Sequence, residues 1–532
     1  MILGIDFGTC YSSIAIMNGS MPITGYFEKL EYEGLGVPTL FMYDQAKGKE
    51  MFGKDCLTAS ATMNSAAVVR NMKKIIRQNP DNPNVQIKSG GKSYSVYEVV
   101  KKYLTHLISK AEEIAKTNDE ITVKKIEGIT ITAPVGISSG QMTATDYNRL
   151  LINTLSDIAA IPKSKVHLLQ EPVAAAISYL YGEDMKRRYN KNQTVLVFDL
   201  GGGTLDVTVV EHDPTTKEYV VKAKEGDLNL GGNDWDDALC ESVLEKTGVA
   251  GEFATTEEML AFRREMLKLK HQLTDVEDAM PIFKYKGRPR FCEYTRWEFE
   301  RASEHLLNRA IEVTKRAISS GTKWGVSEID KIILVGGSCN MPQIRERMLR
   351  EFSELGSARI ITHDPSKAIA KGAAVYAEMI KRGEFSHNED NEGPGGLKNL
   401  VSHTYGFDSQ RSSDKRNMIY NVLYKNTPYE GSIKAISESS FVAIKDSQDH
   451  LSFTVYESDC IENVGDEDNW MDYGSGEKEN GMKVTVYIPE THLGKATTWP
   501  VWVSFALDSN EVLEIIITDI NGKRVGYDKK QI

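Results

Sequence analysis

Two short motifs combine an aspartate, one or more glycines and a threonine between apolar stretches of the chain. They are Asp6-Phe7-Gly8-Thr9 and Asp199-Leu200-Gly201-Gly202-Gly203-Thr204. Glycine lets backbone N–H groups approach an anion closely, because no Cβ stands in the way. A carboxylate beside such amides can hold a hydrated Mg²⁺ ion over phosphates. Each motif therefore predicts a tight hairpin that could bind phosphate, although the second motif taken alone also fits an ordinary hairpin.

The spacing of the two motifs favours phosphate binding over a pair of ordinary turns. They lie about 190 residues apart, which indicates an internal duplication of whole subdomains rather than a short-period repeat. Two facing hairpins, each with an aspartate and a threonine, could clamp the phosphates of a nucleotide between two lobes.

Three further segments could contribute to the same site, and each has a simpler alternative. Gly336-Gly337-Ser338 follows an apolar strand and precedes a helix, where amides and the helix dipole together favour a phosphate. Gly231-Gly232 also precedes a helix, and a plain N-cap explains it equally well. Glu171 lies at a strand-to-helix corner, where it could simply complement the helix dipole. The basic segment at residues 68–77 is by itself typical of a solvated face.

The composition is that of a globular protein with more than one domain. The chain has 532 residues, too many for one core, and is 41% hydrophobic and 26% charged. Its net charge of −11 argues against a general nucleic-acid binder. No apolar run approaches the roughly 20 residues of a membrane span, and no signal peptide is recognised. The six cysteines are scattered without a CxxC pair, which fits reduced thiols in a cytoplasm and gives no support for a zinc site.

Strands and helices alternate in the first 380 or so residues, which indicates an α/β architecture. Helices are expected at residues 98–116, 143–158, 257–275, 296–320 and 366–382, and strands at 126–134 and 165–169. Trp297 is expected on the core face of the helix at residues 296–320. Gly372 is expected to permit close packing of the helix at residues 366–382. After a polar linker at residues 386–396 the pattern is one of strands, at 482–488, 501–507 and 512–518.

These segments together resemble the seventy-kilodalton heat-shock (DnaK-type) chaperones over nearly the whole chain. The hairpins at residues 4–12 and 198–207 look like that family's two phosphate hairpins, and the second match is highly specific. Glu171-Pro172-Val173-Ala174-Ala175-Ala176 looks like its Glu-Pro-Thr-Ala-Ala-Ala segment. Other similar segments are 226–234, 334–338, Lys425-Asn426-Thr427-Pro428, Val455-Tyr456-Glu457 and the hairpin at 503–518.

The resemblance implies three parts and two activities. An actin-like (ribonuclease H-like, duplicated) α/β ATPase domain would occupy residues 1–384, a linker 385–400, and an all-β sandwich 401–532. The ATPase would use ATP or ADP with Mg²⁺, and the β domain would bind unfolded or extended polypeptide. A J-domain-type co-chaperone and a nucleotide exchange factor are the other expected partners. Nucleic acid and membrane are not expected as partners. The expected location is the cytoplasm.

The resemblance also assigns roles to residues. Lys73 would position the attacking water and the γ-phosphate, Glu171 would orient metal-bound water, and Asp199 with Thr204 completes the catalytic set. Asp6 and Asp199 would hold Mg²⁺ through water, with Glu171 beside them. Positioning and charge neutralisation are what phosphoryl transfer needs. The expected nucleotide contacts are Asp6, Gly8, Thr9, Cys10, Tyr11, Gly201, Gly202, Gly203, Thr204, Gly231, Gly232, Lys270, Thr274, Gly336, Gly337 and Ser338.

Several positions depart from the family pattern. At the adenosine pocket, Leu267 stands where a glutamate is usual, Asn340 where an arginine often packs on adenine, and Ser366 where an aspartate is usual. These changes leave the phosphate site intact and put the base preference in doubt. The linker end at residues 397–401 is less apolar than the family's, so coupling of the two domains is expected to be weak or different. The chain is also expected to be a bacterial-type homologue without a helical lid over the substrate site.

Two functional hypotheses follow from the residues and the resemblance. The first is an ATP-hydrolysing, chaperone-like protein whose β domain binds extended polypeptide. The alternative is a nucleotide-sensing scaffold with one dedicated protein partner and little or no general chaperone activity, motivated by the missing lid and the altered linker. A sugar kinase on the same scaffold is disfavoured, because the β domain has no role there, and fold alone does not decide function.

Overall fold

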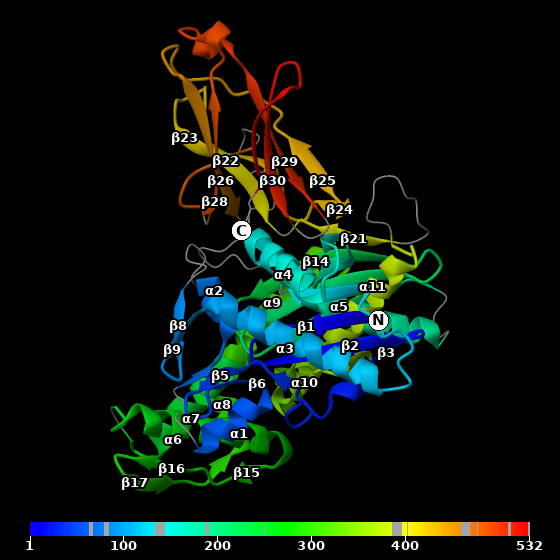
Figure 1. Cartoon of the computed structure of the whole chain (residues 1–532), viewed down its shortest axis with the longest axis vertical. Helices are drawn as coiled ribbons and strands as arrows, with labels where there is room; N and C mark the ends of the chain where they lie inside the picture. The colour runs from blue at the N-terminus through cyan, green and yellow to red at the C-terminus, as the bar shows by residue number, and fades with distance from the viewer. Residues whose placement is uncertain are drawn as a thin grey trace.

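The computed structural model describes most of the chain. It covers residues 1–532 except 63–66, 79–84, 134–143, 187–190, 250–251, 386–395, 402, 459–468, 476, 509–511 and 530–532. Most of the expected polar linker, together with Pro134 and Cys460, lies outside the described residues. A β-rich part lies at one end of an α/β part (Figure 1). Among the described helices, none is long and apolar enough to cross a membrane.

Two sheets of the α/β part have the same strand order. In each, a central antiparallel hairpin is extended by two parallel strands on one side and an antiparallel strand on the other. This repeat matches the duplication expected from the two motifs. The first sheet has the order β11 (Val166–Gln170), β10 (Gly128–Ala133), β1 (Ile2–Asp6), β2 (Tyr11–Asn18) and β3 (Met21–Ile23). The second has the order β20 (Ile360–Thr362), β19 (Lys331–Val335), β12 (Gln193–Leu200), β13 (Leu205–Asp213) and β14 (Glu218–Asp227).

Helices α5 (Glu171–Met185) and α11 (Ala368–Lys381) pack against each other and against strands of both sheets. Small residues make this contact close. A Cβ at Gly372 would lie 1.7 Å from the Ala174 carbonyl oxygen, and a Cβ at Gly4 of β1 would lie 2.2 Å from that of Ala370. The expected packing role of Gly372 is therefore confirmed. Pro172 lies in the first turn of α5, where its missing N–H leaves no hydrogen bond unmade.

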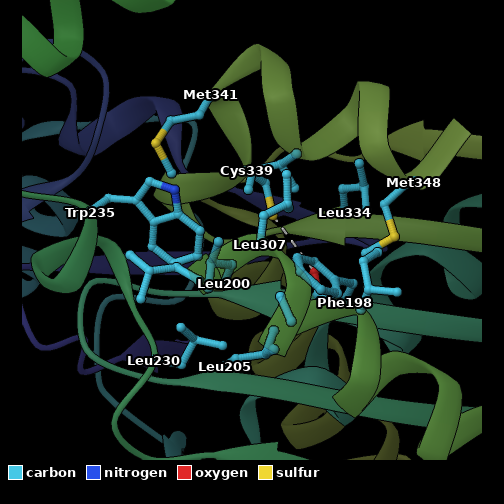
Figure 2. Packing of buried hydrophobic residues seen from close by; sticks show 14 of the residues in the cluster. Phe198, Leu200, Leu205, Leu230, Trp235, Leu307, Leu334, Cys339, Met341 and Met348 are labelled. Atoms are coloured by element: carbon cyan, nitrogen blue, oxygen red, sulfur yellow. Dashed lines mark hydrogen bonds between the residues drawn. The ribbon is translucent and has the colours of Figure 1, made fainter. Parts of the chain in front are cut away.

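The second hairpin rests on a large apolar core. Phe198, Leu200 and Leu205 of the hairpin are fully buried, and Trp235 packs beside them (Figure 2). Neighbouring strands contribute to this core, and so do the helices α6 (Gly232–Lys246), α7 (Thr256–Asp275), α9 (Glu304–Gly321) and α10 (Pro342–Glu351). The hairpin turn is thereby held in place by the burial of its own strands.

One expected helix is two helices. The segment at residues 296–320 divides into α8 (Arg296–Ala302) and α9, with Ser303 between them. The side chain of Trp297 belongs to α8 and is 62% exposed, so its expected place in the core was wrong. The break at Ser303 explains this, because residues on either side of it no longer share one helical face.

The remaining elements of the α/β part surround these sheets. Helix α3 begins after Ser95, whose hydroxyl accepts a hydrogen bond from the Glu98 N–H as an N-cap. The helices are α1 (Lys54–Thr62), α2 (Met72–Gln78), α3 (Val96–Thr117) and α4 (Ala144–Ala159). The strands are β4 (Val37–Pro38), β5 (Phe41–Asp44), β6 (Lys49–Phe52), β7 (Val68–Val69), β8 (Gln86–Ser89), β9 (Lys92–Ser95), β15 (Asp278–Ala279), β16 (Ile282–Tyr285), β17 (Arg288–Phe291) and β18 (Tyr294–Thr295).

The β-rich part consists of two antiparallel sheets that share one apolar core. Alternate residues of two strands point into this core, as the sequence pattern predicts, from Met482 to Ile488 and from Val501 to Leu507. One sheet has the order β27 (Trp470–Met471), β23 (Asn417–Leu423), β22 (Thr404–Gln410), β26 (His450–Ser458) and β28 (Lys478–Tyr487). The other has the order β25 (Ile433–Ile436), β29 (Val501–Leu507), β30 (Leu513–Asp519) and β31 (Arg524–Lys529).

A short strand connects the two parts through backbone pairing. Strand β21 (Leu397–Leu400) pairs in parallel with β14, and β24 (Pro428–Glu430) of the β-rich part pairs with the other edge of β21. The Lys224 ammonium donates a hydrogen bond to the Leu400 carbonyl at 3.0 Å, and Lys398 pairs with Glu218 at 2.5 Å. Residues 397–400, expected as the end of a linker, thus belong to the second sheet.

The contact between α5 and α11 gives a prediction for stability. Gly372→Ala places a methyl group against the α5 backbone, and we expect the free energy of unfolding to fall by about 1–3 kcal/mol. The matched control is Gly182→Ala on α5, where a Cβ meets nothing within 4 Å and helix propensity alone raises stability by up to ~1 kcal/mol. Thermal unfolding of both variants measures the difference. Equal melting temperatures would contradict the close contact.

Candidate functional site

The turns of the two hairpins face each other. A Cβ at Gly202 would lie 2.6 Å from the Cys10 sulfur, and a Cβ at Gly203 would lie 3.5 Å from the Thr9 side chain. The two motifs, distant in sequence, therefore meet at one place between the two sheets. Within the described chain, the N–H groups of Thr9, Cys10, Gly202 and Gly203 donate no recorded hydrogen bond to protein atoms. These four N–H groups are therefore available to bind an anion.

The amides at the start of α6 are used inside the protein, where the Gly231 N–H donates to the Asp234 carboxylate at 2.7 Å. The Gly232 N–H donates to the Gly201 carbonyl at 2.9 Å, and the Asn233 N–H to the Gly202 carbonyl at 2.8 Å. A Cβ at Gly231 would lie 2.5 Å from the Gly203 backbone. These amides are occupied within the protein, so the structure favours the alternative that the sequence left open, a capped helix start. The loop at residues 231–233 still supports the glycine turn at residues 201–203, because it packs against the back of that turn.

The loop at residues 336–338 supports the same turn. The Ser338 hydroxyl donates to the Gly201 carbonyl at 2.9 Å. Gly336 has φ +83°, and a Cβ there would lie 2.3 Å from the Leu200 carbonyl and 2.7 Å from the Asp199 carboxylate. Only glycine fits this position. Gly337 is exposed and a Cβ there would meet nothing within 4 Å, so it remains accessible to a ligand.

Four charged residues from four elements lie together beside the hairpin turns. Lys73 of α2 pairs with Glu171, the first residue of α5, at 2.5 Å, and both side chains are buried. The Lys73 ammonium also donates to the Phe7 carbonyl at 3.0 Å, which ties it to the first motif. Asp6 ends β1, and Asp199 is the last but one residue of β12. The structure therefore brings Lys73, Glu171, Asp6 and Asp199 into one cluster, as expected for the catalytic and metal-binding set.

Carboxylates outnumber cations in this cluster. Burial and then the charge of Glu171 raise the pKa of Asp6 to about 7, while Lys73 opposes the shift. Burial, Glu171 and Asp206 raise the pKa of Asp199 well above its ordinary value. A set of carboxylates in need of positive charge is chemically suited to Mg²⁺, which prefers oxygen ligands and keeps several waters.

Direct binding of a metal by the protein is a separate question. Among the described residues, no group of three or more His, Cys, Asp or Glu side chains is arranged to hold a metal ion. The family resemblance implies that Asp6 and Asp199 hold Mg²⁺ through water molecules, with Glu171 orienting metal-bound water, and this remains a prediction. The oxygen donor set and the glycine turns fit such a hydrated ion over phosphates.

The residues expected around the nucleoside have partners of their own. Lys270 on α7 pairs with Asp236 at 2.7 Å and donates to the Gly232 carbonyl at 3.1 Å. The Thr274 hydroxyl donates to the Lys270 carbonyl at 3.2 Å, so it stabilises its own helix.

Tyr11 follows the first turn, and burial raises the pKa of its hydroxyl above the ordinary value. Burial also raises the pKa of the Cys10 thiol to about 11, so this group is neutral.

The three positions that depart from the family pattern lie as follows. Leu267 is half-buried on α7. The exposed Asn340 side chain donates to the Gly337 carbonyl at 3.1 Å. The Ser366 carbonyl accepts a hydrogen bond from the Ser13 hydroxyl at 2.6 Å. None of the three presents the charged group that is usual at its position.

Three residues that shape the site were not predicted from the sequence. Asp206 lies directly opposite Asp199 in the β12–β13 ladder and is buried, and its position two residues after Thr204 was a usable signal. Asp236 neutralises Lys270, and its place in the first turns of a helix gave no sign of this pairing. Thr132 of β10 lowers the pKa of Asp6, and its hydroxyl donates to the neighbouring Ile5 carbonyl at 3.5 Å, a contact that depends on the pairing of β1 with β10.

Comparison with known proteins identifies the family. The family model described as "Hsp70 protein" matches residues 2–459, most of the chain. The chain therefore belongs to the Hsp70 family.

Similar curated proteins carry chaperone names. One is "Chaperone protein HscA" of Buchnera aphidicola subsp. Baizongia pistaciae, 26% identical over 464 residues, which cover 84% of this chain and 80% of that protein. Others are "Chaperone protein DnaK" of Deinococcus deserti and of Deinococcus radiodurans, each 28% identical over 407 residues. Those alignments cover 71% of this chain and 59% of each DnaK, so the chain spans less than two thirds of these two relatives.

The raised pKa of Asp6 gives a prediction on pH. A carboxyl group with a higher pKa in the folded state than its ordinary 3.8 is favoured while protonated, so its contribution to stability is lost as pH rises through about 7. We expect Asp6→Asn to raise the free energy of unfolding at pH 8, by roughly 4 kcal/mol at most, and to have little effect at pH 4. Thermal unfolding of metal-free, nucleotide-free protein across this range measures it. If the difference in unfolding free energy between Asp6→Asn and wild type is the same at pH 4 and pH 8, Asp6 is already ionised at pH 4.

Proposed function

We propose that this protein binds ATP with Mg²⁺ and hydrolyses it in an actin-like domain at residues 1–384, and that it acts as a chaperone through its β-rich part. The observation that carries the proposal is that the buried Lys73–Glu171 pair lies with Asp6 and Asp199 beside two facing glycine turns. Family membership supports the same activity.

The residues of the cluster would act by positioning and charge. The amides of Thr9, Cys10, Gly202 and Gly203 bind phosphate oxygens, and the Thr204 side chain lies at the exit of the second turn. The Lys73 ammonium, held by Glu171 and by the Phe7 carbonyl, orients a water molecule beside the terminal phosphate. Bound Mg²⁺ would neutralise charge on the phosphate oxygens. Asp6 and Asp199 would fix its water shell, and positioned charges of this kind lower the barrier to phosphoryl transfer.

The β-rich part offers a sheet edge for an extended polypeptide. Strand β25 is the last strand of its sheet, and among the described strands it pairs with β29 alone within that sheet. The chain continues along the same edge to a bridge between Phe441 and Val501. Three apolar side chains are exposed on this segment: Ile436 (56%), Val442 (44%) and Ile444 (59%). An unpaired edge with exposed apolar residues can accept an added strand and its side chains.

The backbone pairing of the two parts bears on the alternative function. A scaffold with a single dedicated partner needs no polypeptide-dependent turnover, whereas a coupled chaperone does. Strand β21 joins both parts in one sheet, and this connection favours coupling. A J-domain-type co-chaperone and an exchange factor are proposed as further partners from family membership.

The first test is ATP turnover by site variants. We expect Asp199→Asn to reduce the steady-state rate at least ~100-fold, because it removes a carboxylate from the metal-binding set. Lys73→Met should reduce the steady-state rate to a similar extent, because it removes the cation proposed to face the terminal phosphate. Lys74→Ala is the matched control, since Lys74 is the next residue on α2 and is exposed. Turnover of wild type that survives both site substitutions would refute the assignment.

The second test concerns the sheet edge at β25. We expect a mixture of apolar peptides to increase ATP turnover of the wild type, and Ile436→Lys to weaken peptide binding about tenfold because a charge replaces an exposed apolar contact. Tyr487→Lys on β28 is the control, an exposed apolar position on the other sheet. Fluorescence anisotropy of a labelled peptide measures binding. Peptide-independent turnover would favour the dedicated-partner scaffold instead.

A further inference from the structure

A buried histidine lies beside the strand that connects the two parts of the chain. His212 of β13 is 1% exposed, and its ring is stacked on that of Tyr219, with ring centroids 4.2 Å apart. Tyr219 lies opposite His212 in the β13–β14 ladder and opposite Leu397 in the β14–β21 ladder. One residue of β14 therefore contacts both the histidine and the connecting strand.

Both ring nitrogens of His212 face hydrogen-bond acceptors. Nε2 lies 2.7 Å from a carboxylate oxygen of Asp184, near the end of α5, and Nδ1 lies 3.0 Å from the Glu218 carbonyl oxygen. A carbonyl and an ionised carboxylate can only accept, and a neutral imidazole carries a single N–H. The two bonds form together only when both nitrogens are protonated. The geometry is therefore that of a positively charged imidazolium inside the protein.

The peptide group between Glu218 and Tyr219 joins this histidine to β21. Its carbonyl accepts the bond from Nδ1 of His212, and its N–H, which belongs to Tyr219, donates to the Gly396 carbonyl at 2.8 Å. Gly396 directly precedes β21. Hydrogen bonds at both ends of one peptide group polarise it in the same sense and strengthen each other. The proton on Nδ1 thus stabilises the bond that holds the start of the connecting strand.

Loss of one proton would affect the two bonds of His212 unequally. The remaining proton is favoured on Nε2, because a bond to a carboxylate is charge-assisted and stronger than a bond to a neutral carbonyl. Nδ1 would then present a lone pair to the Glu218 carbonyl, so that two acceptors face each other. This contact is repulsive and leaves buried polar atoms unpaired, which is unfavourable. Deprotonation is therefore expected to weaken the attachment at Gly396.

The other charged groups around the ring are bonded elsewhere. His212 shares the face of β13 that packs on α5, whereas α9 covers the opposite face, and Gln193 of β12, opposite His212, is uncharged. Burial raises the pKa of the Tyr219 phenol well above its ordinary value, so this group stays neutral. Nearby titratable side chains have recorded partners: Glu183 with Lys186, Glu211 with Lys222, Glu218 with Lys398, Glu384 with Lys217, Asp213 with the amides of Thr215 and Thr216, and Tyr181 with the Ser20 carbonyl. Asp184 is the acid bonded to the ring.

We propose that His212 is a proton-dependent switch for the pairing of β14 with β21. With the ring charged, its two bonds hold the Glu218–Tyr219 peptide in the orientation that binds Gly396. With the ring neutral, β21 and the β-rich part attached to it separate from β14 more readily. The pairing is therefore strong at low pH and weakens as pH rises. Histidine suits this role because its ordinary pKa, about 6.5, lies close to physiological pH. The inference goes beyond the proposed ATPase and depends on the pairing of β14 with β21.

The experiment measures amide hydrogen exchange of residues 397–400 by mass spectrometry, in the full chain without nucleotide, between about pH 5 and about pH 8.5. Observed rates are divided by the intrinsic rate at each pH, so that only protection by structure is compared. His212→Phe keeps an aromatic ring and removes both N–H groups. The matched control is His106→Phe on α3, since His106 is half-buried and stacked on Phe52 in the same way.

We expect the protection of residues 397–400 in wild type to fall about tenfold as pH rises, because one buried hydrogen bond is lost. His106→Phe should behave as wild type does, and His212→Phe should show low protection at every pH. Asp184→Asn should move the fall to lower pH, because the imidazolium loses its counter-charge. This third variant tests the proposal even if His212→Phe does not fold. Exchange of residues 205–210 in β13 is the check that the sheet itself is intact.

Two kinds of result would overturn the switch. One is protection of residues 397–400 that does not change with pH in wild type, or changes equally in wild type and His212→Phe. The other is an equal fall of protection at residues 205–210, which would show a general effect of pH on the fold. Because no nucleotide is present, the expected exchange in a protein that does not hydrolyse ATP would refute the proposed ATPase and leave the switch intact.

Discussion

The buried ion pair between Lys73 and Glu171 is the interaction on which the arrangement of the site depends. It joins α2 to the start of α5, and the same ammonium binds the Phe7 carbonyl beside Asp6. Three segments that are far apart in the sequence are thereby held at one point. A buried ion pair contributes little net stability after desolvation, so its value lies in fixing geometry. Its single cation does not balance the surrounding carboxylates, and this imbalance makes the site receptive to a divalent cation.

The glycines act on that geometry in two different ways. Gly202 and Gly203 keep their amides available at the hairpin turn, whereas Gly232 and Asn233 use theirs to hold that turn from behind, and Gly231 packs against it. Gly336 allows the third loop to pass beside Asp199. The two glycine turns are therefore backed by a second layer, in which other glycines permit the close packing that supports the turn with the free amides.

The sequence predicted the chemistry of the site better than its packing. Motif spacing placed Asp6, Asp199 and the glycine turns together, because short-range rules on turns and strands apply to contiguous residues. It could not show that the amides of Gly232 and Asn233 are occupied by internal hydrogen bonds, since these depend on the approach of two loops. Trp297 was misplaced because Ser303 interrupts a helical pattern that looked continuous.

Charge pairing was the least predictable feature. The partners of Lys270 and Lys73 lie 34 and 98 residues away in the chain, and nothing in the local pattern marks them. The basic segment around Arg70 is by itself typical of a solvated face, and only the family resemblance singled out Lys73; in the structure Arg70 is half-buried and Lys73 almost wholly buried. Solvation of a charged segment can be judged only when the elements packed over it are known.

The strand β21 has a mechanical consequence. It lies between β14 and β24, pairing with two residues of one and three of the other, so it is an inner strand held by very short ladders (Figure 1). An inner strand cannot slide by one residue without breaking the pairs on both sides at once, because the ladder bonds load together. Tension between the two parts would therefore be resisted up to a threshold and then released in a single step. Such a connection breaks as a unit and does not stretch gradually.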